Sequence, residues 1–429
     1  MVVALITYRA AVDALFARTS GGWKLGLDTT RALLASLRDP HEQFPSVHVG
    51  GTNGKGSTVA TLDTLLRAEG FRVGRYMSPH LVDFRERIVV DGEPIGEEDV
   101  TDFADRWMPD VERLGATFFE ATTAMAFHWF AREAVDVAVV EVGLGGRLDA
   151  TNVIRPVVAG VTSIGLDHEQ YLGSTIQEIA REKAGIFKSG VPVVVGGPEP
   201  VAAGLLLEHA REAGAPRVEL VRERLVESRI AVSAAGTRFA WRCAERSVEL
   251  QTPLVGRHQA WNTAAALAML ELAGPPYSRA VGPANEHLAG VHLPGRFDRR
   301  GDVIFDVAHN PAGVSVLAQT LADVAPSRPI AALFAVLRDK DWRAMIEIIA
   351  PHVDHFVLTT PPSAPADRAW SLEEATAFAR ARGWSAVALA DFDEAIARAR
   401  EGAETTLVIG SFHTVGDAMQ RLQVSPLSR

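Results

Sequence analysis

The chain has 429 residues, of which 47% are hydrophobic and 22% are charged, and its formal net charge is -10 at pH 7. This length leaves room for two or three domains with separate cores, and the composition is typical of a globular protein and excludes a disordered one. The negative charge argues against nonspecific binding to nucleic acid or to an anionic membrane.

The single cysteine, Cys243, excludes an intrachain disulfide, and no apolar run approaches the ~20 residues that a helix needs to cross a bilayer. The N-terminus lacks the basic segment, apolar stretch and cleavage site of a secretion signal. We therefore expect a cytoplasmic protein that binds neither membranes nor nucleic acid.

The first strong pattern in chain order is a glycine-rich turn between a strand and a helix. Residues 47–49 are apolar, the turn GGTNGKGS occupies residues 50–57, and helical spacing follows over residues 58–68, so we expect the helix to begin near Ser57. The first N–H groups of a helix lack intrahelical partners and attract an anion, so this turn can hold phosphate oxygens. Lys55 can then reach the terminal phosphates of a nucleotide, and the Ser57 hydroxyl can bind Mg²⁺.

The turn departs from the usual phosphate-loop spacing, G-x-x-x-x-G-K-[ST]. Val49 stands at the position of the first glycine, and Gly56 separates Lys55 from the hydroxyl residue. An ordinary glycine turn that joins a strand to a helix is the alternative interpretation. A lysine and a serine together at the start of the helix favour the phosphate-binding one.

Strands and helices continue to alternate through the first two thirds of the chain. Apolar runs rich in β-branched residues occur at residues 72–77, 135–142, 157–164 and 191–195. Because helical segments separate such runs, we predict a mostly parallel sheet covered by helices. Residues 217–252 change to short alternating runs with charges, which predicts a small antiparallel region at the edge of this domain.

The pattern is interrupted near residue 292 and then resumes. Residues 288–300 contain a proline, a glycine and several charges. Beyond them, strand-like runs at residues 303–307, 330–337, 355–360 and 406–409 alternate with helical segments at residues 312–325, 342–349, 371–382 and 392–401. The sequence therefore predicts an α/β protein with a P-loop domain over residues 1–292 and a smaller, Rossmann-like α/β domain over residues 293–429.

Polar side chains follow three of the predicted strands of the first domain. Glu141 ends an otherwise apolar run, where an unpaired carboxylate is costly and where open α/β sheets collect ligands. Ser78 and His168 follow two further strands. Together with Ser57 they form an oxygen-rich set with one imidazole, which suits Mg²⁺ better than zinc. Capping of the next turn by Glu141 and ordinary hydrogen bonding by His168 are the alternatives.

The second domain offers an acid, an imidazole and an amide just past a predicted strand, at Asp306, His309 and Asn310. Because Pro311 follows Asn310, as at the start of many helices, these residues can be a cap, a ligand contact or both. Charged clusters at residues 338–341 and 410–414 also follow strands, where a cleft between the two domains would lie.

Short motifs in a fixed order run through nearly the whole chain. They are GTNGKGS at residues 51–57, SPHL at 78–81, VVEVGLGGRLDATNVI at 139–154, LDHEQYLG at 166–173, REKAGIFK at 181–188, LPGRFD at 293–298, DVAHNP at 306–311, LRDKD at 337–341 and GSFHTV at 410–415. This ordered set resembles the folylpolyglutamate synthase and dihydrofolate synthase branch of the Mur ligase family. The resemblance implies an ATP-dependent amide ligase with an N-terminal P-loop domain and a C-terminal Rossmann-like domain.

The resemblance also implies roles for individual residues. Those that would contact ATP are Thr52, Asn53, Gly54, Lys55, Gly56, Ser57, Asn262, Arg296 and Asp306. Those that would hold Mg²⁺, at two sites, are Ser57, Ser78, Glu141, His168 and Lys183, the last carboxylated on its amine to a carbamate. Without the resemblance, the sequence indicates only a surface lysine on a helix at Lys183. The pterin-bearing substrate would contact Trp23, Phe118, Phe119, Glu120, Leu148 and Asp149.

The reaction that the resemblance implies has two chemical steps. A carboxylate is a poor electrophile, so its oxygen must first attack the γ-phosphorus of ATP to give an acyl phosphate, while Lys55, the amides of the turn and Mg²⁺ neutralise charge. The amine of glutamate then attacks the carbonyl carbon, with His309 or a metal stabilising the tetrahedral oxyanion, and domain closure keeps water out. The predicted catalytic residues are therefore Lys55, His309 and Lys183.

The sequence leaves the substrate open. The enzyme could join dihydropteroate to a first glutamate, extend reduced folates with L-glutamate or do both. The stretch Phe118-Phe119-Glu120 resembles the dihydropteroate-binding stretch of bifunctional bacterial enzymes, and this resemblance favours both activities. A cell-wall precursor ligase is the nearest enzymatic alternative, and a P-loop nucleotide switch is the alternative from another class. The resemblance further implies a monomer, and dependence on K⁺ stays open.

Overall fold

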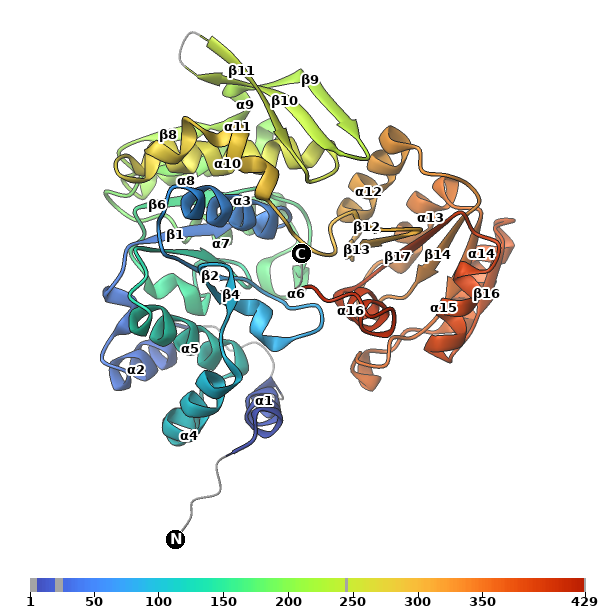
Figure 1. Cartoon of the computed structure of the whole chain (residues 1–429), viewed down its shortest axis with the longest axis horizontal. Coiled ribbons are helices and arrows are strands. Elements are labelled where there is room, and N and C mark those ends of the chain that lie inside the picture. The colour runs from blue at the N-terminus through green and yellow to red at the C-terminus, as the bar shows by residue number, and fades with distance from the viewer. Residues whose placement is uncertain (1–5, 20–25, 244–245, 428–429) are drawn as a thin grey trace.

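The computed structural model describes residues 6–19, 26–243 and 246–427. The strands of these residues form three sheets, of eight, three and six strands. Figure 1 shows the eight-stranded sheet with its helices on one side of the molecule and the six-stranded sheet with its helices on the other. We call the part up to Gly290 the N-terminal unit and the part from Asp298 to Arg421 the C-terminal unit.

The eight-stranded sheet is mostly parallel, as the sequence predicts. Its strand order is β4-β3-β2-β5-β1-β6-β7-β8, in which the neighbours from β2 to β8 are parallel, whereas β3 and β4 form an antiparallel edge. The strands are β1 (Ser46–Gly50), β2 (Val73–Tyr76), β3 (Ile88–Val90), β4 (Glu93–Pro94), β5 (Val137–Glu141), β6 (Val158–Val161), β7 (Val193–Val195) and β8 (Val218–Leu220). The central strands β1 and β5 are buried along their whole length, because helices cover both faces of the sheet.

One face of this sheet packs against α3 (Lys55–Ala68) and α10 (Arg257–Ala273), through the buried cluster that includes Leu62, Leu66 and Leu267. The other face is covered by α1 (Tyr8–Phe16), α2 (Asp28–Ser36), α4 (Glu97–Leu114), α5 (Phe118–Arg132), α7 (Ile176–Ala184) and α8 (Pro200–Glu212). The short helices α6 (Glu169–Leu172), α9 (Val221–Arg224) and α11 (Ala284–His287) lie in the connections. α3 begins two residues before the predicted Ser57, because the left-handed backbone of Gly54 ends the turn there.

Antiparallel pairing within residues 217–252 is confirmed for three of its strands, which lie outside the main sheet, whereas its first strand pairs parallel with β7. Only β8 joins the edge of the eight-stranded sheet, whereas β9 (Leu225–Ser233), β10 (Gly236–Cys243) and β11 (Arg246–Thr252) form a separate sheet. Phe239, Trp241 and Leu250 of that sheet are buried in the same cluster as α10, above which the sheet lies in Figure 1. One apolar face therefore holds this sheet on the N-terminal unit.

The C-terminal unit is a second α/β layer, as predicted. Its strand order is β12-β13-β17-β14-β15-β16, parallel except at β12. Its elements are β12 (Asp298–Arg300), β13 (Val303–Asp306), α12 (Pro311–Val324), β14 (Ile330–Phe334), α13 (Trp342–Ile349), β15 (His355–Leu358), α14 (Leu372–Ala381), β16 (Ala386–Ala388), α15 (Phe392–Arg400), β17 (Thr405–Ile409) and α16 (Phe412–Arg421). The boundary between domains at residue 292 stays a prediction, although each unit has its own buried clusters.

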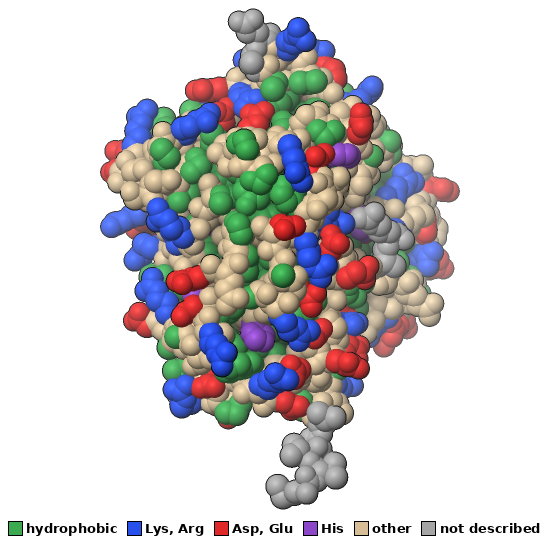
Figure 2. Space-filling model, turned by 60° about the vertical axis from the view of Figure 1, so that its left-hand side comes forward, with side chains coloured by type: hydrophobic (Ala, Val, Ile, Leu, Met, Phe, Trp, Pro, Cys, Tyr) green, Lys and Arg blue, Asp and Glu red, His purple; other side chains and the backbone are tan. Residues whose placement is uncertain are grey.

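The surface is charged without a large patch of one sign on the face that Figure 2 views, where acidic and basic side chains are interspersed. Among the described residues, no helix is both long and apolar enough to span a membrane.

Candidate active site

The glycine-rich turn joins β1 to α3 and is held in shape by its own lysine. Lys55 Nζ donates to the carbonyl oxygens of Gly51 (3.1 Å) and Thr52 (3.2 Å). Gly54 has a φ of 91°, and a Cβ there would lie 2.2 Å from Asn262 Oδ1 of α10, so only glycine fits. The structure therefore brings Asn262 against the turn, which we call the phosphate loop (residues 51–57).

The segment that follows β6 fastens the phosphate loop from the other side. The backbone N–H of Thr52 donates to the carbonyl oxygen of Ser163 (2.8 Å), and the Thr52 hydroxyl accepts from the N–H of Gly165 (3.0 Å). The backbone N–H of Asn53 donates to Ser163 Oγ (3.0 Å), and Thr162 Oγ1 donates to the carbonyl oxygen of Asn53 (2.6 Å). The loop and residues 162–165 therefore form one hydrogen-bonded body.

Glu141 ends β5 beside the start of α3, and only 4% of it is exposed. Its Oε2 accepts from the backbone N–H of Ser78 (3.2 Å) and lies 4.0 Å from the position that a Cβ of Gly56 would take. Burial raises the pKa of Glu141, and the charge of Lys55 opposes that rise. A buried carboxylate next to the hydroxyl residues Ser57 and Ser78 fits the oxygen ligands that Mg²⁺ prefers.

His168 lies beside Asp167, and none of the described contacts joins it to Glu141. Its Nε2 is 3.9 Å from Asp167 Oδ1, and burial lowers its pKa to about 4, against the opposing charge of Asp167. Within the described residues, no three His, Cys, Asp or Glu side chains converge as a metal cluster. The structure thus joins Ser78 to Glu141 and leaves His168 with Asp167.

Lys183 is not the surface lysine that its sequence context alone suggests. It projects from α7, is 5% exposed, and its Nζ donates to the carbonyl oxygen of Gly51 (3.1 Å), the same oxygen that Lys55 contacts. Burial and, next, the charge of Lys55 lower its pKa to about 7. The tertiary structure therefore places a lysine that loses its proton near neutral pH at the phosphate loop.

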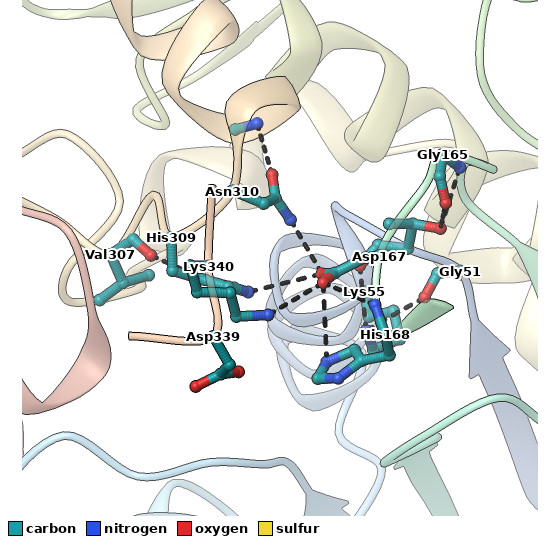
Figure 3. Close-up of polar contacts among 12 residues, drawn as sticks. Gly51, Lys55, Gly165, Asp167, His168, Val307, His309, Asn310, Asp339 and Lys340 are labelled. Atoms are coloured by element: carbon teal, nitrogen blue, oxygen red, sulfur yellow. Dashed lines mark hydrogen bonds and ion pairs between the residues drawn. The ribbon is translucent and has the colours of Figure 1, made fainter. Parts of the chain in front are cut away.

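Asp167 joins the two units, as Figure 3 shows. Its Oδ1 accepts from Lys340 Nζ (3.0 Å), its Oδ2 accepts from Asn310 Nδ2 (2.9 Å), and His309 Nε2 lies 3.7 Å from Oδ2. Burial alone would raise the pKa of Asp167, but the contacts with His309, Lys340 and His168 outweigh it and hold that pKa well below its ordinary value. His309 is further fixed by a hydrogen bond from Nδ1 to the carbonyl oxygen of Val307 (3.0 Å).

Asn310 caps α12, which confirms one of the two interpretations open at the sequence level, and it also contacts Asp167; a ligand contact stays a prediction. Its Oδ1 accepts from the N–H of Gly313 (2.7 Å) at the start of α12, while its amide nitrogen donates to Asp167. Asp306, at the end of β13, accepts from the N–H groups of Phe297 and Ala308 (2.9 Å each).

Arg296 lies between the units. Its guanidinium is 5.2 Å from the ring centroid of Phe412. Burial lowers its pKa, and the charges of Asp306 and Glu141 oppose that shift, so Arg296 faces carboxylates of both units.

Two of the predicted substrate residues of α5 make ring contacts, and the third caps the helix. Phe118 stacks on Phe16 at 4.7 Å between ring centroids, with the guanidinium of Arg87 5.1 Å from its ring centroid. Phe119 packs against Gly143, where a Cβ would lie 2.4 Å from its ring. Glu120 is buried and accepts from the N–H of Thr117 (2.8 Å), so its carboxylate caps its own helix.

The remaining predicted substrate residues follow β5, except one. Asp149 is buried and accepts from the N–H groups of Leu144 (2.8 Å) and Thr151 (3.0 Å), which are local backbone bonds. Leu148 is half-buried in the same turn. Trp23 lies outside the described residues.

Sequence reasoning did not single out Asp167 or Arg87. Arg87 is 7% exposed, donates from Nε to His80 Nδ1 (2.7 Å), and pairs with no carboxylate in the described ion pairs. Asp167 stands next to His168 in the motif LDHEQYLG, so the motif itself was the available signal. Its partner Lys340 lay in the charged cluster at residues 338–341, but only the fold brings the two together.

Two family models match the chain. The Mur ligase middle domain matches residues 49–270, and the glutamate ligase domain of Mur ligases matches residues 295–412. The dihydrofolate synthase/folylpolyglutamate synthase of Bacillus subtilis is 35% identical, over 97% of this chain and 99% of that protein.

Solved structures agree with these matches. Mycobacterium tuberculosis folylpolyglutamate synthase complexed with ADP superposes with a TM-score of 0.86 at 33% identity, covering 98% of this chain and 99% of that one. E. coli FolC in complex with DHPP and ADP superposes with a TM-score of 0.84 at 33% identity, covering 97% of this chain and 98% of that one. The chain therefore belongs to the folylpolyglutamate synthase and dihydrofolate synthase family of Mur ligases and is an ATP-dependent ligase.

Proposed function

We propose that this chain adds L-glutamate both to dihydropteroate and to reduced folates, through an acyl phosphate made with ATP. The observation that carries the proposal is the convergence of Lys55 and Lys183 on the carbonyl oxygen of Gly51, on a phosphate loop that faces the C-terminal unit. The B. subtilis relative is named for both activities, which supports the bifunctional assignment.

The nucleotide would lie on the phosphate loop, between the two units. Its contacts would be Thr52, Asn53, Gly54, Lys55, Gly56, Ser57, Asn262, Arg296 and Asp306. Relatives solved with ADP support a nucleotide as a ligand of this chain. The proximity of Asn262 to Gly54, and of Arg296 to the charges of Asp306 and Glu141, agrees with that set.

Ser57, Ser78, Glu141 and His168 would hold Mg²⁺, and a carboxylated Lys183 would join a second metal site. Mg²⁺ supplies positive charge that neutralises the phosphoryl oxygens. The buried Glu141 carboxylate fits that cation, because burial disfavours its charge until a partner is present.

Lys183 is suited to form a carbamate. Its neutral amine can attack the carbon of CO₂, lose a proton and become a carboxylated nitrogen, and its pKa of about 7 keeps much of the amine neutral near physiological pH. A carbamate signal in the ¹³C NMR spectrum of protein equilibrated with ¹³C-bicarbonate, absent from Lys183→Ala, would support this. Equal spectra would contradict it.

The chain's own groups then act in sequence. Lys55 and the amides of the phosphate loop stabilise charge on the phosphoryl group as the substrate carboxylate attacks the γ-phosphorus and ADP leaves. The glutamate amine would attack the acyl carbon to give a tetrahedral oxyanion. His309 would stabilise this oxyanion as an imidazolium, donating from Nε2 while its Nδ1–H donates to the carbonyl oxygen of Val307. Phosphate would then leave, and the amine nitrogen would release its proton to the departing phosphate or to solvent. The C-terminal unit over the loop excludes water, which would otherwise hydrolyse the acyl phosphate.

The pterin-bearing substrate would lie against Phe118, Phe119 and the turn at Leu148, with Trp23 completing the set. Glu120 and Asp149 would act indirectly, because both carboxylates already accept local backbone hydrogen bonds. We propose a monomer that acts on these small molecules alone.

The test is incubation with ATP, Mg²⁺, L-glutamate and either dihydropteroate or tetrahydrofolate, followed by mass spectrometry. We expect a glutamyl unit on both acceptors, with release of phosphate only when glutamate and an acceptor are present. A product with one acceptor would limit the enzyme to one activity. Phosphate release that needs neither glutamate nor acceptor would favour the nucleotide switch and overturn the proposal.

A further inference from the structure

One segment of the N-terminal unit has two sets of partners. Residues 162–165 bind the phosphate loop through Thr52 and Asn53, as described above. Two residues further along, Asp167 binds the C-terminal unit. A short segment, residues 162–167, therefore connects the phosphate loop to a contact between the units.

The partners of Asp167 come from two separate segments of the C-terminal unit. Asn310 caps α12, and Lys340 lies in the turn before α13, so the carboxylate fixes two helix starts at once. The side chains of Asp167 and Lys340 are only 10% and 13% exposed. An ion pair this sheltered from water is screened less than a surface pair, and breaking it leaves two poorly solvated charges until the units separate.

We infer that Asp167 is a positioning residue that holds the C-terminal unit closed over the phosphate loop and aims His309 at it. The inference rests on the proposed ligase function, because closure matters to a reaction whose acyl phosphate must be kept from water. It assigns Asp167 no contact with the reacting atoms. Its role is to make closure of the C-terminal unit depend on the position of residues 162–165.

His309 shows why closure and catalysis would be joined. Its Nδ1 bonds to the carbonyl oxygen of Val307, so its Nε2 is the nitrogen that faces Asp167 across the interface (Figure 3). When Asp167 holds the C-terminal unit, the His309 ring is held against Asp167, which lies two residues beyond the segment that binds the phosphate loop. When the units part, the ring moves away with β13 and α12.

A second ion pair between the units provides a contrast. Arg257, at the start of α10, pairs with Asp323 of α12 at 3.2 Å, but 47% of the Arg257 side chain is exposed. Neither residue touches the segment 162–168 in the described contacts. We expect this pair to contribute little to closure, because solvent screens it.

The experiment compares variants that remove one partner or a neighbouring acid. Asp167→Asn removes the charge with almost no change of shape, and Lys340→Met removes the cation while keeping the length of the side chain. Asp323→Asn is the control for the loss of any ion pair between units. Asp339→Asn is the control for the loss of an acid next to Lys340, because Asp339 pairs with Arg368 inside the C-terminal unit.

Closure is read as a distance between two dyes on the full chain. The exposed native thiol is first removed as Cys243→Ser, and dyes are attached at Glu112→Cys on α4 and Ala377→Cys on α14, two exposed positions on opposite units. The distance is measured by single-molecule energy transfer, with and without a non-hydrolysable ATP analogue and Mg²⁺. The affinity for that analogue and the steady-state kcat are measured on the same variants without dyes.

We expect Asp167→Asn and Lys340→Met each to lower kcat about tenfold or more and to reduce the closed population, while the affinity for the analogue changes less than about threefold. Lys340→Arg should keep most of the closure, since it keeps the cation. The double variant should be no worse than the worse single one. Both controls should stay within about twofold of the parent in kcat.

Parent-like closure and kcat in both Asp167→Asn and Lys340→Met would overturn the inference. Equal effects in Asp323→Asn would also overturn it, because the loss of any ion pair between the units would then reduce closure and kcat. If Asp167→Asn does not fold, Lys340→Met carries the same prediction alone. The distance between the dyes and the affinity for the nucleotide are measured without an acceptor substrate. A parent protein that closes but makes no glutamyl product would therefore refute the proposed function and leave this inference standing.

Discussion

Burial and neighbouring charge decide what the individual residues around the phosphate loop can do. Lys55 and Lys183 donate to one carbonyl oxygen, that of Gly51, yet only Lys183 is enclosed by α7 and the sheet. Its amine therefore carries a pKa of about 7. Glu120 and Asp149 illustrate the opposite case, because backbone N–H groups already occupy their oxygens. Residue type alone does not distinguish these situations.

Lys55 is the residue whose loss should matter most to chemistry and least to the fold. Lys55→Ala should lower kcat for ligation by about a hundredfold or more, because a preorganised positive donor to the transferring phosphoryl group is lost. Its two hydrogen bonds are to carbonyls of its own loop, so circular dichroism and thermal unfolding should change little. An enzyme with parent-like kcat would refute the role given to this lysine.

At the scale of elements, the phosphate loop depends on glycines that combine a positive φ with a close neighbour, and Gly54 is one of them. Gly54 has a φ of 91° and faces Asn262 at 2.2 Å from the position of a Cβ. Gly70, past the end of α3, has a φ of 80° but nothing within 4 Å of that position. At both positions a residue with a Cβ would have a strained backbone, but only at Gly54 would that Cβ also meet a close neighbour.

Gly54→Ala and Gly70→Ala therefore separate strain from contact. Gly70→Ala should lower the free energy of unfolding by about 1 kcal/mol and leave kcat unchanged. Gly54→Ala should lose more stability than that and should also weaken nucleotide binding, because the loop must move away from Asn262. Urea unfolding and calorimetric titration with an ATP analogue measure the two effects. Equal losses of stability with unchanged binding would show that Asn262 does not constrain the loop.

At the scale of the whole molecule, acid should weaken the fold through a histidine in its centre. His48 is fully buried in β1, its Nε2 lies 2.9 Å from Thr151 Oγ1, and its Nδ1 has no hydrogen-bond partner in the described structure. Burial lowers its pKa to about 3, from an ordinary value near 6.5. Between these values the unfolded chain binds a proton that the folded chain does not, so the free energy of unfolding falls as the pH falls.

The expected size of this effect is up to about 1.4 kcal/mol per pH unit below 6.5 from His48 alone. Urea unfolding of the parent and of His48→Gln at pH 7 and pH 5 measures it. The variant is less stable at pH 7, because a smaller amide leaves space in the core, but it should lose less stability between the two pH values. Parallel losses in both proteins would show that His48 does not carry the effect.

The sequence by itself determined the order of the elements and most of the local chemistry. Alternating apolar runs and helical spacing predicted two mostly parallel sheets, because period and chain order are local properties. β3, β4, β12 and β16 were missed, because strands of two or three residues carry little periodicity unless a longer apolar run surrounds them, as it does at β7. The motifs placed Glu141 and Asp306 at strand ends and Lys55 at the start of a helix, where the structure has them.

Only the tertiary structure decided which of these residues meet. It put Lys183 in the interior beside the phosphate loop, turned Glu120 and Asp149 toward their own backbone, and brought Asp167 against Asn310 and Lys340, which follow it by more than 140 positions in the chain. Burial and contacts between distant segments depend on how the whole chain packs, so they cannot be predicted from a short stretch of sequence. The contact between the two units is the clearest case, because it exists only when both are folded and closed.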